Sequence, residues 1–478
     1  MDKTTSTVIG NGEKAHKYVF DKVEGLSPGL AQLRQKLGVK AQREPRFRFY
    51  SLYAHIYHIE TLRTAWKLIR QNGQSPGIDG LTYDDIDHVD NVADENLAEY
   101  MANQKVETFL KGIQEELKNK TYKPMPVRRV NILKEDGRER PLGMPTIKDR
   151  LVQMATVLII EPIFEQDFLD CSYGFRPNKS AHEAIQEIAM NLRVGRTAVY
   201  DADLKGYFDS IPHEQLMNCI KMRITDGSVL KLIKSWLTAP IVEKEKDDNG
   251  KWNITITKPS CGTAQGGVIS PLLANVYLNW FDIRFHAKDG PRQFANARLV
   301  RYADDFVVMA KHIGSRISDS IEYLIEGWLK LEINKDKTRT VTLTEIGESI
   351  DFLGFTFRVE RSLFKDGNYI RIEPKKKAIQ KAMDKIKDLT SSSMNFKPID
   401  VVIGDVNAFL NGWKGYFKVG HPDRVFGKMD NYVRKKVANH LNRRSQRKHN
   451  RPKNLTWYAY LKKLGLVRLS DKSRTYAG

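Results

Sequence analysis

The sequence predicts an α+β protein that ends in a separable helical domain. Its 478 residues are about three times the usual domain length of ~150, so we expect more than one domain. Strand-like runs of β-branched and aromatic residues mix with amphipathic helical stretches up to about residue 374, and the remainder is helical and basic. Hydrophobic residues make up 41% and charged residues 28%, a globular composition that excludes a disordered chain.

The elements follow from local patterns taken in order. Residues 1–45 are polar without convincing periodicity, and we expect a partly ordered arm. Residues 50–120 have a helical pattern that the Gly- and Pro-containing loop at 74–80 interrupts. Amphipathic periodicity predicts further helices over 149–168, 179–194, 213–238, 270–288 and 315–330. Alternating β-formers predict a strand at 197–203 and hairpins at 241–257, at 298–310 and through 352–355.

The net charge is concentrated at the C-terminal end. Residues 375–478 hold 25 Lys and Arg against 7 Asp and Glu, which is nearly all of the chain's formal charge of +20. A solvated basic face is the simplest explanation, but aromatic residues such as Trp457 and Tyr458 lie among the cations. Cations neutralise phosphates and rings stack on bases, so this region favours a nucleic-acid partner. Trp413, Tyr416 and Phe417 have helical spacing and are predicted to lie in the core instead.

A second basic cluster forms a predicted β-hairpin. The strand-like sequence that begins Val127-Arg128-Arg129 is followed by a Glu-Asp-Gly turn and by Arg140-Pro-Leu-Gly-Met. Cations on both arms, Lys134 and Arg140 among them, suit a flap over phosphates. An exposed hairpin with ordinary solvated Lys and Arg is the alternative.

The most informative feature is a pair of adjacent carboxylates, Asp304 and Asp305, between two apolar β-forming runs. A buried strand does not tolerate unpaired carboxylates, because removing each anion from water costs on the order of several kcal/mol of folding free energy. We therefore expect a tight turn that presents the two acids to cations at the edge of a sheet. A turn Asp-Asp without any chemistry is the alternative.

A second strand runs into acids about one hundred residues upstream, at Asp201, Asp203 and Asp209. Two strands that bring three carboxylates together would form an all-oxygen site for two Mg²⁺ ions, which prefer carboxylate, water and phosphate oxygens. Spacing alone does not decide which upstream acid takes part. Asp201 and Asp203 share one face of the strand, and Asp209 is expected to cap the next helix.

Between the two acidic segments lies Gln265-Gly-Gly-Val-Ile-Ser-Pro271. The glycines permit close backbone approach, and Ser270 followed by Pro271 is typical of a helix start. Such a loop could hold a template or nucleotide against the acids, although an ordinary loop-to-helix entry would have the same pattern.

Cellular location is predicted from what the sequence lacks. Cys171, Cys219 and Cys261 lie far apart and make no CxxC motif, which favours a reducing cytoplasm. The first twenty residues lack the apolar core of a signal peptide, and no stretch approaches the ~18 apolar residues of a spanning helix. We expect no membrane segment.

Seven blocks, in order, resemble the reverse transcriptases encoded by bacterial group II introns, which also act as maturases. The resemblance covers roughly residues 55–475 and is carried by Pro76–Gly80, Arg140–Thr146 with Asp149-Arg150, Ser172–Pro177, Ala202–Asp209, Gln265–Asn275, Tyr302–Asp305 and Phe352–Phe355. It implies a right-hand polymerase fold. The implied organisation is an arm at 1–45, fingers and palm at 46–374, a thumb or maturase domain at 375–430, and a basic nucleic-acid-binding segment at 431–478.

The resemblance also implies roles for individual residues. Asp203, Asp304 and Asp305 match the catalytic acids that bind two Mg²⁺ ions, with Leu204 beside them in the metal site. Nucleotide binding is implied for Lys134 and Arg140 on the triphosphate, for Phe208 under the deoxyribose, and for Gln265. We expect nucleic-acid contacts from a set of cations on the hairpin, the 172–177 block and the C-terminal segment: Arg128, Arg176, Lys435, Lys436, Arg443, Arg444, Arg447 and Lys448.

Two departures from the family pattern are visible. Ala264 stands where many relatives have Pro, which we expect to be tolerated. No Cys- and His-bearing HNH endonuclease follows the thumb, so priming is expected on single-stranded or replication-fork DNA. The expected partners are intron RNA, a DNA primer or target, and dNTPs, and the oligomeric state is open.

The leading hypothesis is an RNA-directed DNA polymerase that also binds intron RNA and assists splicing. A second hypothesis, motivated by the basic C-terminal region, is a splicing cofactor whose essential role is RNA binding, and the two roles can coexist. A third is a domesticated relative in DNA repair or phage defence, which the absence of intron RNA domains beside the gene would indicate. A non-catalytic nucleic-acid-binding fold fits least well, because all three acids are present.

Overall fold

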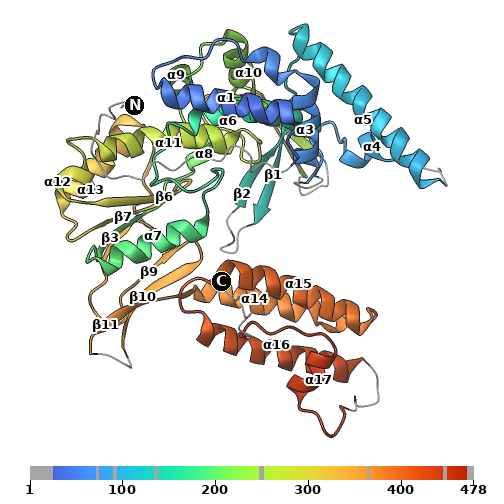
Figure 1. Ribbon diagram of the computed structural model, residues 1–478, viewed down its shortest axis with the longest axis vertical. Coiled ribbons are helices and arrows are strands. Elements are labelled where there is room, and N and C mark those ends of the chain that lie inside the picture. Colours follow the sequence, from blue (N-terminus) through green and yellow to red (C-terminus); the bar gives the residue numbers. More distant parts are fainter. Residues whose placement is uncertain are drawn as a thin grey trace, which may run out of the picture. The chain divides into compact units, whose positions relative to one another are not determined.

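The computed structural model of the protein describes residues 25–470 except 72–74, 90–93, 134–136, 138, 247–251, 363–365, 445–448 and 450. Contacts divide the chain into two compact units (Figure 1). The first unit contains residues up to Lys179, Lys205–Ile283 and Ile325–Glu332, and the second contains Ser180–Leu204, Arg284–Leu324 and the residues from Ile333 onward.

A buried helix organises the first unit. Helix α6 (Ile147–Phe164) is buried along most of its length and packs against α1, α2 and α3. Its apolar side chains point in all directions, which is why neighbours cover it on several sides. The other helices that lie in or begin in this unit are α1 (Pro28–Arg43), α2 (Tyr53–Ile56), α3 (Ile59–Arg70), α4 (Tyr83–Asp87), α5 (Glu95–Lys118), α8 (Tyr207–Ser210), α9 (His213–Lys221), α10 (Gly227–Leu237) and α11 (Ser270–His286).

Helix α1 falls inside the segment that the sequence predicted to be a partly ordered arm. Its Arg34 is buried and donates hydrogen bonds to the Leu158 carbonyl (2.6 Å) and to the Glu161 carboxylate (2.7 Å) on α6. Hydrophobic periodicity does not predict this helix, because Arg34 and Gly38 stand at buried positions beside Leu30 and Ala41. Ser27, whose hydroxyl caps the helix, and Pro28 at its first position are the signals that mark its start.

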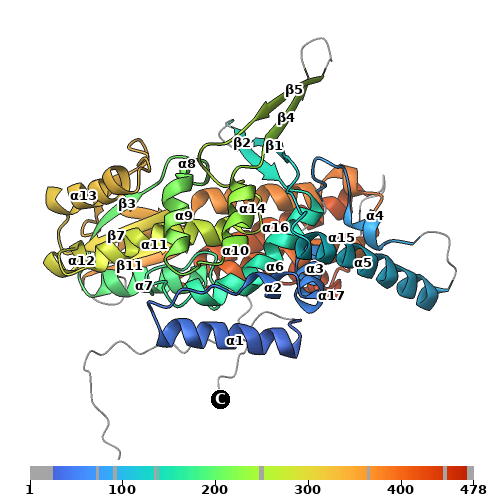
Figure 2. The same cartoon turned by 90° about the horizontal axis from the view of Figure 1, so that it is seen from above.

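The first unit also holds a four-stranded sheet of order β2-β1-β4-β5. It consists of β1 (Val127–Leu133), β2 (Glu139–Met144), β4 (Ile241–Lys246) and β5 (Trp252–Thr257). Both predicted hairpins are confirmed: β1 pairs antiparallel with β2, and β4 with β5, while two parallel pairs join β1 to β4. Figure 2 shows β4 and β5 extending well beyond β1 and β2.

The second unit is built on a four-stranded sheet of order β6-β7-β3-β8. Its strands are β3 (Ala198–Ala202), β6 (Arg298–Tyr302), β7 (Asp305–Ala310) and β8 (Arg339–Thr342). The residues of β7 after Asp305 are all buried, and α7 (Ala181–Arg193) packs against β6. Two short helices, α12 (Pro291–Phe294) and α13 (Ser315–Glu322), also belong to this unit. A π-helical turn over Tyr323–Trp328 follows α13, and from Ile325 its residues belong to the first unit.

A three-stranded sheet of order β11-β10-β9 connects to the C-terminal helices of the second unit. Its strands are β9 (Ser349–Phe352), β10 (Phe355–Arg361) and β11 (Asn368–Pro374), and the helices are α14 (Lys376–Leu389), α15 (Ile399–Phe417), α16 (Asp423–Arg443) and α17 (Trp457–Lys463), with a 3₁₀ turn at Ser392–Met394. Trp413 and Phe417 are buried, as predicted, but Tyr416, predicted to lie in the core with them, is 37% exposed. Because α16 continues through residue 430, no break in structure marks the predicted boundary there.

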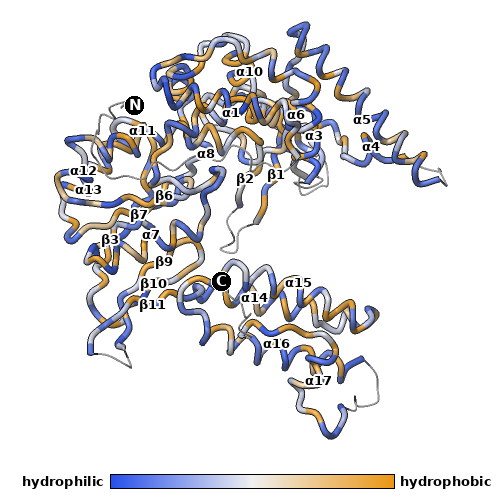
Figure 3. Tube along the Cα trace, in the orientation of Figure 1, coloured by the Kyte–Doolittle hydropathy of each residue, from blue (hydrophilic) through white to orange (hydrophobic). Residues whose placement is uncertain are grey.

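Figure 3 shows hydrophilic residues along much of α5 and α16. Among the helices of the described residues, none has both the length and the apolar character needed to cross a membrane.

Candidate active site

Asp304 and Asp305 lie at a two-residue hairpin turn, as the sequence predicted. Tyr302 at the end of β6 pairs with Asp305 at the start of β7, which leaves Ala303 and Asp304 as the turn residues. Ala303 has a φ of 58°, a strained conformation for a residue other than glycine. The buried Arg301 guanidinium donates to the Ala303 carbonyl at 2.9 Å and so supports this turn.

Strand β3 brings Asp203 to the same end of the sheet. β3 pairs antiparallel with β7, with Ala202 opposite Phe306. One further residue in this register puts Asp203 opposite Asp305, and directly opposed residues share a face of the sheet. Leu204 follows, buried and bridged to Ile333. The three acids named by the family resemblance therefore meet at the end of one sheet in the second unit.

The Asp305 carboxyl is electrostatically strained. Desolvation by the surrounding protein, with repulsion from Asp304, Asp203 and Asp201, raises its pKa to about 7, although Asp305 is exposed at the start of β7. A carboxyl with this pKa is only partly ionised at neutral pH. Nearby positive charge would favour its ionised form, so the electrostatics of the site favour a bound cation.

The Asp203 carboxylate already has one positive and one neutral hydrogen-bond donor. The Lys337 ammonium lies 2.7 Å from its Oδ2, and Asn334 donates to the same oxygen at 3.0 Å. The segment that carries both residues is held in place by the Asn334 amide, which donates to the Asp203 carbonyl at 2.8 Å. Lys337 and Asn334 were not predicted from the sequence, where they read only as polar residues after a helix.

Asp201 has a different role from Asp203. Its carboxylate pairs with the Arg339 guanidinium on β8 at 3.3 Å, and burial still raises its pKa. A cleft of about 610 Å³ collects Asp201, Asp203 and Asp305 together with Lys337 and Arg339. Asp351 and Lys375, paired at 3.1 Å, line the same cleft. Of the two acids between which spacing did not decide, Asp203 lies opposite Asp305 when the β3–β7 ladder is continued, whereas Asp201 pairs with Val307.

The donor atoms of these acids are of the type that a divalent cation prefers, but their positions do not form a complete coordination site. Within the described residues, no group of three or more His, Cys, Asp or Glu side chains is positioned to hold a metal ion. The donor set is nevertheless carboxylate oxygen, which Mg²⁺ prefers. The raised pKa of Asp305 and the ammonium on Asp203 both mark places where positive charge is stabilised.

A separate group of predicted residues lies in the first unit, around the loop before α11. Thr263 donates its amide to the Phe208 carbonyl at 2.6 Å, and Gly262 donates to Ile211 at 2.8 Å. Gly262 has a φ of +87°, and a Cβ there would lie 2.7 Å from the Asp209 carbonyl oxygen, so only glycine permits this approach. The loop and the α8 turn that carries Phe208 are therefore one packed assembly.

The β1–β2 hairpin joins the same assembly. The Gly143 amide on β2 donates to the Gln265 carbonyl at 2.7 Å, and a Cβ at Gly266 would lie 2.5 Å from the Gly143 carbonyl oxygen. Ser270, predicted as a helix cap, instead donates its hydroxyl to the Ala264 carbonyl at 2.9 Å and closes the loop. The sequence-predicted residues Phe208 and Gln265 are thus brought close to the base of the hairpin.

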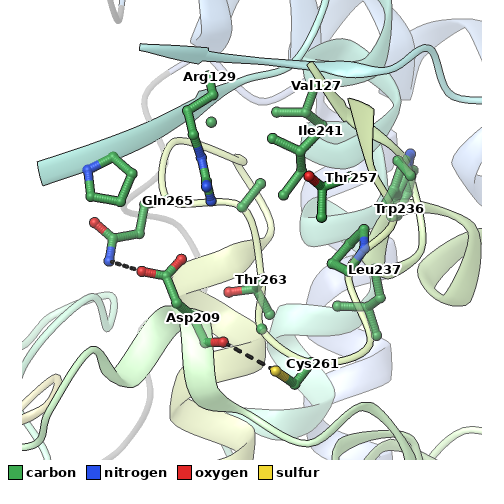
Figure 4. Close-up of a pocket in the computed structure, with 16 residues that line it drawn as sticks. Val127, Arg129, Asp209, Trp236, Leu237, Ile241, Thr257, Cys261, Thr263 and Gln265 are labelled. Atoms are coloured by element: carbon green, nitrogen blue, oxygen red, sulfur yellow. Dashed lines mark hydrogen bonds between the residues drawn. The ribbon is translucent and has the colours of Figure 1, made fainter. Parts of the chain in front are cut away.

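Gln265 also has a side-chain partner. Its Nε2 donates to the Asp209 carboxylate at 3.4 Å, beside a cavity of about 150 Å³ that Arg129 enters from β1 (Figure 4). Asp209 was predicted to cap the next helix, and that prediction is wrong: α9 has Pro212 at its N-cap position without a side-chain cap. The structure instead directs the Asp209 carboxylate toward Gln265.

The two residues predicted to hold the triphosphate are only partly described. Arg140 lies on β2 opposite Ile132, and Lys134 lies outside the described residues. Arg128 pairs with Met144 in the same ladder, so positions 128 and 140 share one face of the hairpin. The Arg128 Nε is buried and makes no hydrogen bond within the described part of the chain.

Arg176 does not fit the predicted role in nucleic-acid binding. Its guanidinium is buried against the Glu165 carboxylate at 2.7 Å and also donates to the carbonyls of Leu169 and Ser172, each at 2.7 Å. A guanidinium with these partners is not presented to a phosphate. Arg176 holds the 165–176 segment together, and we remove it from the set of expected contacts.

The C-terminal cations lie on and after α16. Lys435 and Arg443 are exposed, Lys436 lies 5.2 Å from the Tyr432 ring centroid, and Arg444 donates to the Lys397 carbonyl. Arg447 and Lys448 lie outside the described residues. The exposed members remain predicted nucleic-acid contacts.

Known proteins share this organisation. A model of the reverse transcriptase (RNA-dependent DNA polymerase) family matches residues 132–357, and one of the group II intron maturase-specific domain matches 379–459. Protein YkfC of Escherichia coli is 31% identical over 73% of this chain and 93% of its own length. The group II intron-encoded protein LtrA of Lactococcus lactis is 32% identical over 54% of this chain, and the match spans 51% of LtrA.

Among solved structures, telomerase from Candida albicans with a fragment of telomeric RNA aligns with 72% of this chain and 64% of its own, at 14% identity and a TM-score of 0.37. The two family matches follow each other in the order that the sequence motifs predicted, with the three acids inside the first. The chain therefore belongs to the group II intron-encoded reverse transcriptases, in which a maturase domain follows the polymerase.

Proposed function

We propose that this protein extends a DNA primer on group II intron RNA and binds the same RNA as a maturase. The observation that carries the polymerase proposal is the register of β3 with β7, which continues to Asp203 opposite Asp305, next to Asp304 at the turn. Three carboxylates at one sheet end, beside an open cleft, suit nucleotidyl transfer better than a structural role.

The proposed chemistry depends on this chain's residues in separate roles. Asp203, Asp304 and Asp305 would hold two Mg²⁺ ions, with Leu204 beside them. Bound there, the ions would supply activation of the primer 3′-hydroxyl and stabilisation of the leaving pyrophosphate. Lys337, which lines the same cleft, must then move away from the Asp203 carboxylate or contact it together with an ion. The Asp305 carboxyl ionises fully once positive charge is near, because that charge lowers its raised pKa.

The first unit would position the nucleotide. We propose that Phe208 packs under the deoxyribose and excludes a ribose 2′-hydroxyl, and that Gln265 contacts the nucleotide. The hydrogen bonds of the 261–265 loop to α8 and β2 support this proposal, because they fix both residues without substrate. Arg140 and Lys134 on the hairpin would offset charge on the β- and γ-phosphates.

The maturase role rests on the C-terminal helices. The exposed cations of α16 favour intron RNA as partner, and the match to the maturase-specific domain supports the same assignment. Replacing Lys435 and Lys436 with Glu is expected to weaken intron RNA binding and splicing while leaving primer extension on a short, unrelated template close to normal. Equal loss of both activities would show that this surface serves the polymerase and not a separate maturase function.

Primer extension by the wild type beside an Asp304→Ala variant tests the polymerase proposal. A domesticated relative without an intron would extend a primer as well, so intron RNA domains beside the gene are the observation that separates the two. We propose the bacterial cytoplasm as the location, in agreement with RNA and dNTPs as partners.

A further inference from the structure

Strand β5 presents three large apolar side chains to solvent. The sequence Trp252-Asn-Ile-Thr-Ile-Thr257 alternates strictly, so one face of the strand is apolar and the other polar. Trp252, Ile254 and Ile256 are exposed by 58%, 59% and 66%. The strand belongs to the hairpin that projects beyond the neighbouring β1–β2 hairpin in Figure 2.

Strict alternation is typical of a strand with one face covered. Here more than half of the surface of each apolar residue on this face is open to solvent, and every residue of β5 is exposed. Single exposed apolar residues are ordinary, but three in a row on one face form a patch of the kind that marks an interaction site. The pattern therefore indicates a partner for this face.

The charges of the hairpin separate by face. In the β4–β5 ladder, Lys244 pairs with Ile254 and Lys246 with Trp252, so the two lysine positions share the face of the apolar residues. Lys244 is exposed. Glu243 lies on the opposite face, where it accepts a hydrogen bond from Asn131 at 3.1 Å. A face with planar and aliphatic side chains between cations suits a polyanion with exposed bases.

The same face continues into the β1–β2 hairpin. Arg128 on β1 pairs with Val242 on β4, and Val242 in turn pairs with Ile256 on β5. Ile132, further along β1 on the same face, is 50% exposed. Position 140, the predicted triphosphate contact, pairs with Ile132. By register, the predicted phosphate-binding hairpin and the apolar patch therefore lie on the same face of the four-stranded sheet, with the buried Val242 between them.

We propose that this face, formed by Trp252, Ile254, Ile256 and Lys244, binds a single-stranded RNA segment next to the primed region. The inference rests on the proposed polymerase function and assigns a contact surface for its template. The RNA is unpaired because a ring can stack only on a base that is free of its duplex. A second copy of the chain is a poorer occupant, because a two-fold contact would bring like-charged lysine positions together.

The test compares full-length variants in RNA binding. A triple variant, Trp252→Thr, Ile254→Thr and Ile256→Thr, keeps β-branched residues on an exposed strand, so thermal stability is expected to stay close to that of the wild type. The matched control changes the opposite face, Asn253→Ser and Thr255→Ser. Fluorescence anisotropy measures affinity for an RNA–DNA primer duplex with roughly ten unpaired template nucleotides, and for the same duplex made blunt.

The triple variant is expected to bind the overhanging duplex about tenfold or more weakly, because stacking contributes about 1–3 kcal/mol per base, with little change on the blunt duplex. The control variant should match the wild type on both. Equal affinity of triple variant and wild type for the overhang would overturn the proposal. So would a wild-type dimer in sedimentation that the triple variant loses, with unchanged RNA affinity, since a second copy would then cover the face.

Primer extension measured in parallel separates this inference from the proposed function. If the wild type does not extend a primer but the triple variant shows the expected loss of affinity, the polymerase proposal is contradicted and the RNA-binding face is supported. If the wild type extends a primer and the triple variant binds the overhang as tightly as the wild type does, only the proposed RNA-binding face is contradicted. An overhang of DNA in place of RNA, bound equally well, would contradict RNA as the specific occupant.

Discussion

The Lys337 ammonium lies 2.7 Å from the Asp203 carboxylate, and both residues line the cleft at the end of the β6-β7-β3-β8 sheet. A cation of the protein itself therefore contacts the acid that the family resemblance assigns to metal binding. The contact is partly exposed to solvent, so it can exchange for another cation at modest cost.

Removing this ammonium should strengthen metal binding. We expect Lys337→Ala to bind Mn²⁺ several-fold more tightly, because a competing positive charge beside Asp203 is lost. Titration of Mn²⁺ by electron paramagnetic resonance measures the affinity directly. Lys375→Ala is the matched control, since Lys375 lines the same cleft but pairs with Asp351. An equal gain in both variants would show a general charge effect and no specific competition at Asp203.

The raised pKa of Asp305 predicts a pH dependence of stability in the metal-free protein. The folded-state pKa is about 7, above the unfolded value of about 4, so the folded state binds the proton more tightly. This contribution is present below about pH 4 and is lost as pH rises toward 7. We expect the melting temperature of the Asp305→Asn variant to exceed that of the wild type by a margin that grows between pH 5 and 8 to roughly a few degrees.

Calorimetric scans with and without Mg²⁺ check that prediction. Added Mg²⁺ should stabilise the wild type at pH 8 and change the Asp305→Asn variant much less. A difference between the two proteins that stays constant with pH would contradict the assigned pKa.

Asp209 is predicted to position Gln265. The Asp209→Ala variant loses the carboxylate that accepts a hydrogen bond from the Gln265 side chain, so Gln265 is less well positioned for the nucleotide. The KM for dNTP should therefore rise about threefold to tenfold, with a smaller change in kcat. Steady-state extension on a homopolymer template measures both constants. Gln265→Ala should raise KM similarly, and the double variant should add little. Additive effects in the double variant would mean that the two residues act independently.

Much of the active site could be predicted because its signals are local. The apolar runs around Asp304-Asp305 predict a hairpin turn, and the alternation before Asp203 predicts a strand, so the sequence alone places these three acids at strand ends. The assignment of Asp203 as a proposed catalytic acid had no local signal in the sequence. It depends on the register between strands about one hundred residues apart, and the family resemblance supplied it instead.

The predictions that failed, and those that could not be made, concern specific side-chain contacts that local sequence patterns do not determine. Arg176 resembles any other basic residue in the chain, and only its burial against Glu165 shows that it is structural. Lys337 meets Asp203 across 134 residues, and Asp209 meets Gln265 across 56. Helix α1 was missed because Arg34 and Gly38 interrupt its buried apolar face, and local sequence does not show that Arg34 would bond to Glu161 on α6.

The structural role of Arg176 gives a further prediction. Arg176→Met leaves the Glu165 carboxylate buried without its partner, so the free energy of unfolding should fall by about 3 kcal/mol. Urea unfolding followed by circular dichroism measures the loss. The double variant Arg176→Met with Glu165→Gln should recover part of it. RNA affinity of the folded Arg176→Met protein should be unchanged, and a clear drop in affinity at full folding would restore Arg176 as an RNA contact.

The most direct test of the whole account is Mg²⁺-dependent extension of a DNA primer annealed to an RNA template, with wild type and Asp304→Ala side by side. The account predicts extension by the wild type and a loss of roughly a thousandfold or more in the variant, because the cation-binding acids are incomplete. RNA affinity should be the same in both proteins. Normal Mg²⁺-dependent extension by Asp304→Ala would contradict the assignment of the acids. Tight RNA binding without extension by either protein would contradict the polymerase and leave a maturase alone.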